Sequence, residues 1–196
     1  MIEYIKGLLT EITPTTAIIE NNGIAYCLNI SINTYSSLKE GQECMLYTHQ
    51  IIREDAHLLF GFLGKQEREV FRMLISVNGV GANTARVILS YITIPEIINA
   101  IAEENINVLK SVKGIGIKTA QRIIIELKDK ISSLETENTI VFNSKDNTLK
   151  KDATNALLML GFNKPAIEKV LNKIIEDDKE KSLKLEIVIK KALNYL

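Results

Sequence analysis

One nine-residue pattern occurs twice in the chain and limits its fold more than any other feature. The copies read VNGVGANTA at residues 77–85 and VKGIGIKTA at residues 112–120. Their 35-residue spacing is typical of a duplicated supersecondary unit that packs against its twin. Because each copy follows one helical apolar pattern and opens another, we predict two tight turns, each joining two helices.

The glycines of both turns predict sites for an anion, most naturally a phosphate. Glycine adopts a positive φ at little cost and allows a foreign backbone to approach closely. The first amides of the following helix lack intrahelical acceptors, and the helix dipole adds partial positive charge. A lone Gly-x-Gly motif also fits an ordinary turn between helices, but two matched copies favour phosphate binding. The candidate contacts are Gly79, Gly81, Gly114 and Gly116.

Positive charge is concentrated on the segment that holds the repeats. The chain has 196 residues and no formal net charge, which excludes a uniformly basic coat for nucleic acid. The net charge is −4 for residues 1–64, +3 for residues 65–131 and +1 for residues 132–196. The basic excess therefore coincides with the predicted phosphate sites.

The basic residues after the second turn have two different interpretations. Lys118 and Arg122 are four residues apart near the helix start and lie on one side of it. They could reach a phosphate that the glycine turn already holds. For Lys128 and Lys130, farther along the same helix, we prefer the interpretation of a solvated face.

The cysteine and histidine residues show no metal or disulfide pattern. Cys27 and Cys44 lie in apolar-rich surroundings without a Cys-x-x-Cys spacing, which predicts reduced core thiols in a cytoplasmic protein. His49 and His57 are too isolated to suggest a ligand set. The chain shows no signal-peptide pattern and no apolar run near the ~20 residues that span a bilayer, so we expect a soluble, intracellular protein.

The N-terminal segment, residues 1–63, is predicted to be an OB-type (oligonucleotide/oligosaccharide-binding) β-barrel of five strands. Two β-branched runs flank Asn21-Asn22-Gly23, which is a strong hairpin signal. Further apolar runs follow at residues 43–52 and 58–62. Several short strands in so short a segment favour a closed barrel, because closure removes exposed edges.

Glu54 and Asp55 lie between the last two runs, at the predicted tip of a hairpin. Acidic residues are common in turns, so the residues alone favour a solvated turn. Two carboxylates without further ligands argue against a metal site. A third interpretation is electrostatic, since two negative charges on a projecting tip would repel phosphates nearby.

The rest of the chain is predicted to be helical around one linker. Residues 64–131 form an all-α tandem helix-hairpin-helix domain, and residues 132–149, rich in Ser, Thr, Asn and charge, form a flexible linker. Residues 150–196 form a small three-helix domain without a catalytic or phosphate motif. Such a module more often binds a partner than performs chemistry. The sequence leaves open whether Leu157, Leu160 and Phe162 belong to its core or to a docking patch.

Over its whole length the chain resembles the bacterial RuvA family, the Holliday-junction-binding subunit of the branch-migration complex. The resemblance rests on the order of the domains, on both glycine turns and on REDA, LFGF and KQER at residues 53–56, 59–62 and 65–68. It implies a homotetramer with four-fold symmetry, alone or as a pair of tetramers, that holds a four-way junction open and flat. It also implies a role in DNA recombination, repair and the SOS response, with no cofactor and no catalytic site.

The resemblance further implies roles for individual residues and partners. Backbone amides at the four turn glycines would grip duplex arms without sequence preference, helped by Asn83, Lys118, Thr119 and Arg122. Glu54 and Asp55 match the acidic pin at the junction centre, which replaces the solvated-turn interpretation. Leu157, Leu160 and Phe162 match positions that dock the hexameric ATPase RuvB, and the RuvC resolvase is a further implied partner.

The sequence departs from the family pattern at the two turns. Asn83 and Ile117 stand where the family often has lysine, so each turn would lose one charge-assisted phosphate contact. The predicted barrel is also more acidic than a surface that faces DNA would suggest. We therefore expect junction binding that is weaker or more sensitive to salt.

Enzymatic alternatives have little support in the residues. Helix-hairpin-helix modules also occur in glycosylases, which would need an aspartate shortly after the hairpin, but no Asp lies between Asp55 and Asp129. A two-metal nuclease needs a carboxylate cluster, and none is evident. No Gly-x-x-x-x-Gly-Lys-[Ser/Thr] loop is present, so ATP hydrolysis would come from another protein. A general single-strand binder would need more aromatic residues for stacking.

Overall fold

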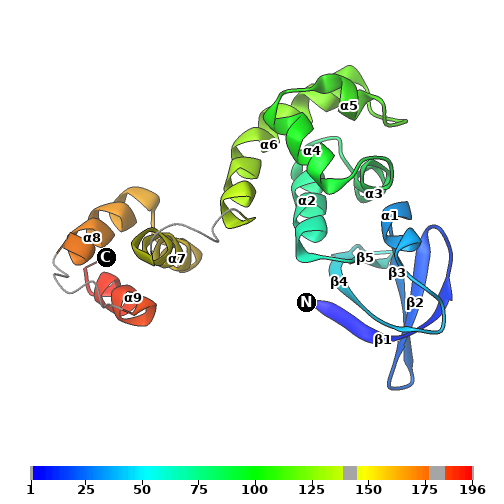
Figure 1. Ribbon diagram of the computed structural model, residues 1–196, viewed down its shortest axis with the longest axis horizontal. Helices are drawn as coiled ribbons and strands as arrows, with labels where there is room; N and C mark the ends of the chain where they lie inside the picture. The colour runs from blue at the N-terminus through cyan, green and yellow to red at the C-terminus, as the bar shows by residue number, and fades with distance from the viewer. Residues whose placement is uncertain (1, 139–144, 177–183, 196) are drawn as a thin grey trace. The chain divides into compact units, whose positions relative to one another are not determined.

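The computed structural model describes residues 2–138, 145–176 and 184–195 (Figure 1). The chain divides into two compact units, Met1–Leu134 and Glu135–Leu196. Each unit has a hydrophobic core of its own, and the first unit contains both the barrel and the two glycine turns.

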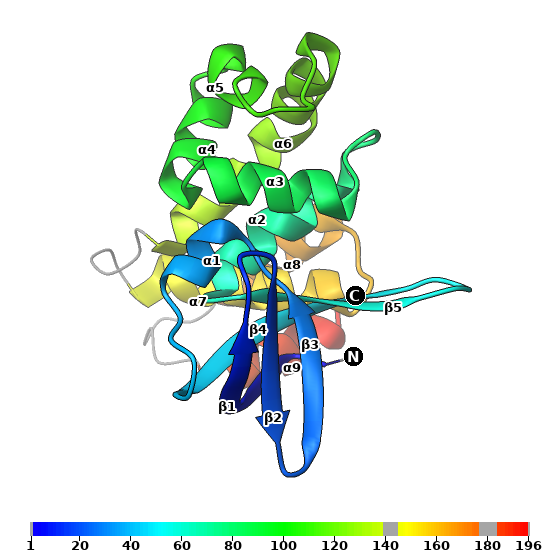
Figure 2. The same cartoon turned by 90° about the vertical axis from the view of Figure 1, so that its right-hand side faces the viewer.

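A closed barrel of five strands lies within the described residues of the first unit, which confirms the predicted barrel (Figure 2). The strand order is β1-β2-β3-β5-β4, and β4 closes the barrel on β1. β3 and β5 pair in parallel, whereas the other neighbours are antiparallel. The strands are β1 (Tyr4–Ile12), β2 (Thr16–Asn21), β3 (Ile24–Asn29), β4 (Glu43–Ile52) and β5 (His57–Phe62).

The barrel interior follows from the alternation of side chains along each strand. Ile19 of β2, Leu28 of β3 and Leu46 of β4 are fully buried inside it. Gly7 of β1 allows a close approach of strands, because a Cβ there would lie 2.0 Å from the carbonyl oxygen of Glu20. The barrel therefore tolerates no side chain at this position without movement of β2.

Two expectations about β2 and β3 have different outcomes. The predicted turn between them is confirmed, since Asn22 and Gly23 have φ values of 49° and 83° and join paired strands. The prediction that Cys27 is a core thiol is wrong, because residue 27 alternates with the buried Leu28 and is exposed. Cys44 is half-buried, and burial raises the pKa of its thiol.

The helices of the first unit confirm the prediction of an all-helical segment after the barrel. Phe60 and Phe62 of β5 belong to the helical core, so the last barrel strand and the helices share one apolar cluster. α4 begins at a capping box, in which the N–H of Thr93 donates to Glu96 Oε2 at 2.9 Å. The helices are α1 (Ile32–Ser36), α2 (Lys65–Ser76), α3 (Ala82–Tyr91), α4 (Ile94–Ala102), α5 (Ile106–Lys110) and α6 (Ile117–Asn138).

The second unit packs α7 (Lys145–Met159), α8 (Lys164–Glu176) and α9 (Leu185–Leu193) around a small aliphatic core. Gly161, with a φ of 95°, closes the end of α7. Its N–H donates to the carbonyl of Leu158 at 2.9 Å. This arrangement is the one that a glycine just beyond a helix end predicts.

The predicted linker, residues 132–149, is helical at both of its ends. α6 continues to Asn138, since Ile131 and Leu134 extend the apolar spacing of the helix in the sequence. α7 already begins at Lys145. Residues 139–144 of the predicted linker lie outside the described residues.

Candidate nucleic-acid interface

The first glycine turn joins α2 to α3 and is anchored in the helical core. Gly79 has a φ of +90°, and the N–H of Val80 donates to the carbonyl of Val77 at 3.0 Å. Both valines are buried in the helical core, and this packing holds the loop in place. Gly81 is the N-cap of α3, and its carbonyl accepts the first helical hydrogen bond from Ala85 at 2.9 Å.

The second turn joins α5 to α6 and repeats this geometry, which confirms the predicted duplication. Gly114 has a φ of +94°, and the N–H of Ile115 donates to the carbonyl of Val112 at 3.0 Å. The N–H of Ala120 donates to the carbonyl of Gly116 at 2.9 Å. Val112 and Ile115 are buried, as their counterparts are in the first copy.

The space in front of both turns is open. A Cβ added at any of the four glycines would meet no atom within 4 Å. Among the described residues no side chain caps α3, and neither α3 nor α6 has an acidic residue in its first turn. The start of α4 differs, because Glu96 occupies it. The starts of α3 and α6 therefore present backbone N–H groups to an external anion.

Arg122 connects the two turns. Its Nη1 donates to the carbonyl oxygen of Asn78 at 3.1 Å, and its Nε lies 4.0 Å from Glu126 Oε1. Asn78 belongs to the first turn and Arg122 to the helix after the second, so this bond links the two candidate sites. The Arg122 side chain is 51% exposed and carries further N–H donors for a phosphate. Sequence alone does not single out Asn78, because it contributes a backbone carbonyl.

The other candidate contacts lie at the surface of the same two helix starts. Asn83 in α3 and Lys118 in α6 are exposed, and Thr119 is partly exposed. Ile117 is 51% exposed, whereas Ala82, which occupies the same position of the first copy, is nearly buried. The second copy thus has more exposed surface and more positive charge than the first.

Lys128 and Lys130 are exposed on α6, as the interpretation of a solvated face predicts, and each also contacts a neighbouring segment. Lys128 forms an ion pair with Glu104, and this hydrogen bond lowers the pKa of the Glu104 carboxyl. Lys130 Nζ donates to Ser76 Oγ at 3.3 Å. Both lysines thus connect α6 to neighbouring segments of the helical domain through polar contacts at the surface.

Glu54 and Asp55 occupy the tip of the β4–β5 hairpin, which projects from the barrel in Figure 2. The strands pair as far as Ile52 and His57, and the N–H of Arg53 donates to the carbonyl of Ala56 at 2.8 Å. Both carboxylates are exposed, and within the described residues neither has an ion-pair partner. The tip therefore presents two exposed carboxylates, beside the exposed Arg53.

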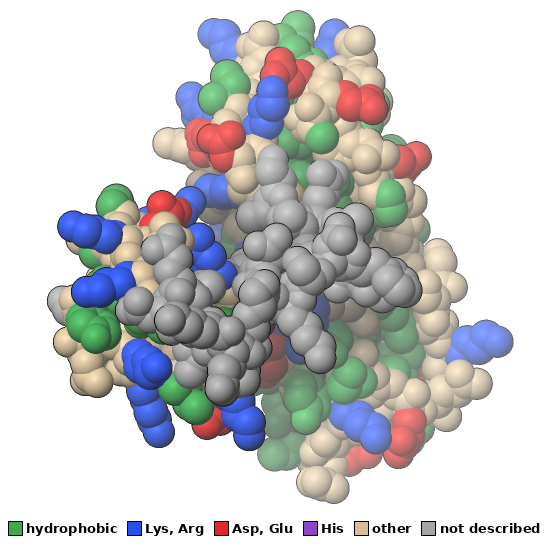
Figure 3. All heavy atoms as spheres, turned by 60° about the vertical axis from the view of Figure 1, so that its left-hand side comes forward, with side chains coloured by type: hydrophobic (Ala, Val, Ile, Leu, Met, Phe, Trp, Pro, Cys, Tyr) green, Lys and Arg blue, Asp and Glu red, His purple; other side chains and the backbone are tan. Residues whose placement is uncertain are grey.

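The structure separates the three apolar candidates of the second unit. Leu157 is fully buried in the core, and Phe162 packs against that core while partly exposed. Leu160 is 60% exposed, next to Met159 at 90%. Figure 3 shows lysines and apolar side chains interspersed on one face of this unit. Leu157 is thus a core residue and Leu160 a surface residue of this unit, and the docking roles stay predictions.

Two kinds of feature are missing from the part of the chain that the structure describes. No group of three or more His, Cys, Asp and Glu side chains is arranged to hold a metal ion. No single helix there is long and apolar enough to cross a membrane. α3 and α4 meet the criteria of length and composition only together, as a pair bent by 102°.

Comparison with known proteins identifies the family of the chain. The model of the RuvA N terminal domain matches residues 1–61, and that of the RuvA C-terminal domain matches residues 149–196. The model of the SAM-like helix-hairpin-helix tandem matches residues 71–129, which include both glycine turns. The chain belongs to the RuvA family. Each part of the predicted order, OB-type barrel, tandem helix-hairpin-helix domain and small C-terminal domain, has its counterpart in these models.

Full-length relatives agree with the RuvA assignment. The chain is 46% identical to the Holliday junction branch migration complex subunit RuvA of Bacteroides thetaiotaomicron. It is 46% identical to the protein of that name from Christiangramia forsetii and 47% identical to that from Parabacteroides distasonis. All three alignments cover the whole of both chains. The RuvA relationship therefore includes the segments that the three family models leave between them.

Proposed function

We propose that the chain binds four-way Holliday junction DNA as the non-catalytic subunit of a branch migration complex. The observation that carries this proposal is the pair of glycine turns, which present open helix starts and are joined by Arg122 and Asn78. Membership of the RuvA family supplies the class of DNA, since the named relatives are Holliday junction branch migration subunits.

The two turns grip phosphates through the backbone. The amides beside Gly79, Gly81, Gly114 and Gly116 donate to phosphate oxygens on duplex arms, and the helix dipoles favour the negative charge. Asn83, Lys118, Thr119 and Arg122 add side-chain contacts at the edges of the turns. None of these groups reads a base, so binding is independent of sequence. That property suits a protein that follows a junction as it moves.

The acidic tip supplies the discrimination between a junction and a plain duplex. Glu54 and Asp55 would stand at the junction centre, where their charge repels the phosphate backbone and favours separated strands. A four-fold symmetric homotetramer, or a pair of tetramers, would hold the arms open and flat around four such tips. We place this assembly in the cytoplasm, where its DNA lies.

The second unit recruits the motor. Its exposed apolar side chains, Met159 and Leu160 beside the half-buried Phe162, are suited to bind the hexameric ATPase RuvB. RuvB would supply ATP hydrolysis, and the RuvC resolvase would act on the same junction. Leu157 supports this surface from within the core.

A competition experiment tests the proposed function. A labelled four-way junction with non-homologous arms is bound by the full-length chain and challenged with unlabelled junction or linear duplex of the same composition. We expect the junction to compete at far lower concentration than the duplex. Equal competition would contradict the proposal. Incubation with Mg²⁺ should leave the DNA strands uncut on a denaturing gel, whereas cleavage would favour the nuclease alternative.

A further inference from the structure

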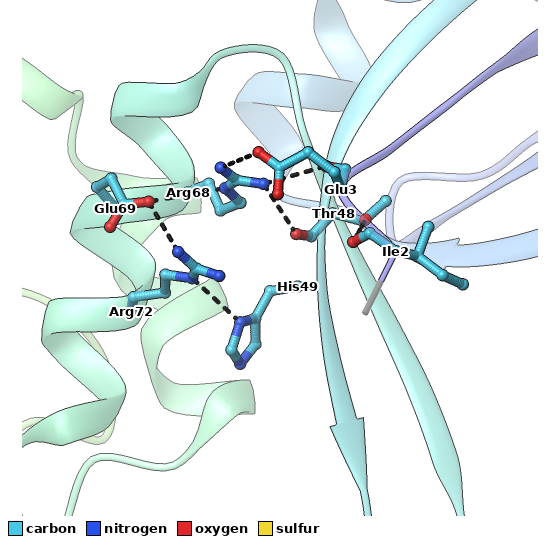
Figure 4. Close-up of polar contacts among 7 residues, drawn as sticks. All are labelled: Ile2, Glu3, Thr48, His49, Arg68, Glu69 and Arg72. Atoms are coloured by element: carbon cyan, nitrogen blue, oxygen red, sulfur yellow. Dashed lines mark hydrogen bonds and ion pairs between the residues drawn. The ribbon is translucent and has the colours of Figure 1, made fainter. Parts of the chain in front are cut away.

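Arg68 of α2 is a buried arginine that reaches two strands of the barrel. Its side chain is 6% exposed, and its Nη2 donates to Glu3 Oε1 at 2.7 Å (Figure 4). Its Nη1 donates to the carbonyl oxygens of Glu3 at 3.0 Å and Thr48 at 3.4 Å. The guanidinium also lies over the ring of Tyr47, 5.6 Å from its centroid. One side chain thus binds the residue just before β1 and a residue in the middle of β4.

Arg72, one helical turn later, holds the next residue of β4. Its Nε donates to His49 Nδ1 at 3.4 Å, and its Nη1 donates to Glu69 Oε1 at 3.0 Å. Figure 4 shows both arginines projecting from α2 toward the strand. The consecutive residues Thr48 and His49 are therefore both fixed from α2.

Apolar side chains also pack α2 against the barrel, at a contact that we call the joint between α2 and the barrel. The ring of Phe71 in α2 lies 5.0 Å from that of Phe60 and 4.9 Å from that of Phe62, both in β5. The hydrophobic driving force has no direction of its own, so hydrogen bonds add a directional constraint to this packing. Hydrogen bonds constrain direction, and the bonds of Arg68 select one orientation.

The buried Arg68 side chain has a free-energy cost of folding that an apolar side chain at this position would not have. Among the described residues its buried Nε has no hydrogen-bond acceptor, and Glu69 Oε1 lies 3.8 Å from it. The pair is buried on the arginine side only, since the Glu3 side chain is 52% exposed, and an ion pair with an exposed partner adds little to stability. A role in geometry accounts for an arginine at this position better than a role in stability does.

The joint lies between the acidic tip of the β4–β5 hairpin and the first glycine turn. From Thr48, β4 continues to Ile52, and the acidic tip at Glu54 follows in the turn, six residues beyond Thr48 and ~20 Å away if the backbone is extended. α2 runs from Arg68 to the first glycine turn. A rotation of about 10° at the joint would thus move the tip by ~3.5 Å relative to the turn. That displacement is comparable with the length of a hydrogen bond.

We infer that Arg68 is a positioning residue that sets the acidic tip relative to the phosphate-binding turns. It acts by fixing β4 on α2 through Glu3 and Thr48, assisted by Arg72 and His49. The inference rests on the proposed function for its consequence on DNA. The geometric part stands independently and can be measured without DNA.

A distance measurement tests the geometric part. Spin labels are attached through Asp55→Cys and Ser111→Cys in a chain with Cys27→Ser and Cys44→Ser, diluted with unlabelled chain so that only distances within one chain contribute. We expect Arg68→Met to shift or broaden the distance distribution and Arg68→Lys to restore it in part, because lysine keeps the charge but cannot bind three acceptors in a fork. An unchanged distribution in Arg68→Met overturns the inference.

Arg86→Met is the matched control. Arg86 also joins a helix to the barrel, but it donates to Thr15 O at 3.1 Å and Asn29 Oδ1 at 3.4 Å and does not reach β4. We expect it to leave the distance unchanged, and an equal change there would contradict the role of Arg68. If Arg68→Met does not fold, Glu3→Gln decides, with a smaller shift in the same direction expected and no shift overturning the inference.

Fluorescence of 2-aminopurine at the crossover, in the otherwise unaltered chain, measures strand separation. We expect Arg68→Met to lose most of the fluorescence increase while keeping the duplex affinity of the original chain, with partial recovery in Arg68→Lys. Full strand separation in Arg68→Met would overturn the positioning role. If the original chain shows no junction preference, the proposed function fails, and the distance measurement still decides the geometric role of Arg68.

Discussion

The carbonyl oxygen of Asn78 accepts a hydrogen bond from the guanidinium of Arg122 at 3.1 Å, across 44 residues of sequence. This bond joins the first glycine turn to the helix that follows the second. The two proposed phosphate sites are therefore linked by a direct polar contact in addition to the shared core. Arg122 can contribute to DNA binding both as a charge and as the link between the sites.

Substitutions at Arg122 separate these two contributions. Arg122→Met should lower junction affinity and reduce the slope of log K against log salt by about 1, because one phosphate contact is lost. Arg122→Lys should keep the slope but recover only part of the affinity, since lysine does not reproduce the planar fork of arginine. Salt titrations of junction binding measure both. Lys39→Met, which removes an exposed charge from the barrel side, should change neither quantity.

Alanine at Gly81 or Gly116 should weaken DNA binding without unfolding the protein. A Cβ at either position meets no atom within 4 Å of the folded chain, so the free energy of unfolding should change by less than about 1 kcal/mol. The same methyl group would stand where a phosphate approaches the helix start. We expect the larger loss of affinity for Gly116→Ala, since the second copy carries more positive charge.

Gly64→Ala is the control for these glycine variants. Gly64 is also a helix N-cap with open space around its Cβ position, but it precedes α2 and lies outside both turns. Its junction affinity should equal that of the original chain. Unchanged binding in both Gly81→Ala and Gly116→Ala would exclude close phosphate contact at the turns.

The repeat predicted the turns because glycine is a local signal. The residue type alone is nearly enough to predict the positive φ at Gly79 and Gly114, because glycine adopts it at little cost. The same holds for the N-cap role of Gly81. The parallel pairing of β3 with β5 was not predictable, because it joins strands far apart in sequence and no local pattern encodes it. The bonds of Arg68 and Arg122 are hidden for the same reason, since their acceptors include backbone carbonyls.

The end of α7 explains why the sequence could not assign the apolar residues near 160 to the core or to the surface. Leu160 follows Leu157 by three residues and would share its buried face if the helix continued. α7 instead ends at Met159, and Leu160 lies in the turn that Gly161 closes. Periodicity identifies a face but not the residue at which the helix stops.

Lysine at the two atypical turn positions should strengthen binding. Asn83 is exposed and Ile117 is half exposed, so Asn83→Lys and Ile117→Lys disturb no core. Each should raise junction affinity and steepen the salt slope by about 1, as one added phosphate contact requires. By the same relation, a chain without these lysines should bind more weakly but with a shallower salt slope, which revises the expectation of greater salt sensitivity. Ile24→Lys adds the same charge at a 58% exposed isoleucine of the barrel hairpin. A matching gain there would attribute the effect to net charge instead of to the turns.

Neutralising the acidic tip should affect strand separation more than binding. Glu54→Gln with Asp55→Asn removes two exposed charges, so the free energy of unfolding should change by less than about 0.5 kcal/mol. Junction affinity should be retained or slightly increased, because repulsion of the backbone is lost. The 2-aminopurine signal at the crossover should fall. The double variant Glu11→Gln with Glu40→Gln removes two other exposed acidic charges of the barrel and should leave the signal unchanged.

Truncation of Leu157 and Leu160 distinguishes core from docking surface in the second unit. Leu157 is fully buried, so Leu157→Ala should lower the free energy of unfolding of this unit by about 2–5 kcal/mol. Leu160 is 60% exposed, so Leu160→Ala should cost less than about 1 kcal/mol while weakening the binding of RuvB. Denaturant unfolding followed by circular dichroism gives the first quantity, and titration of immobilised full-length chain with RuvB gives the second. Because the proposed junction contacts lie in the first unit, Leu160→Ala should leave junction binding unchanged. Loss of stability without loss of RuvB affinity would instead assign Leu160 to the core.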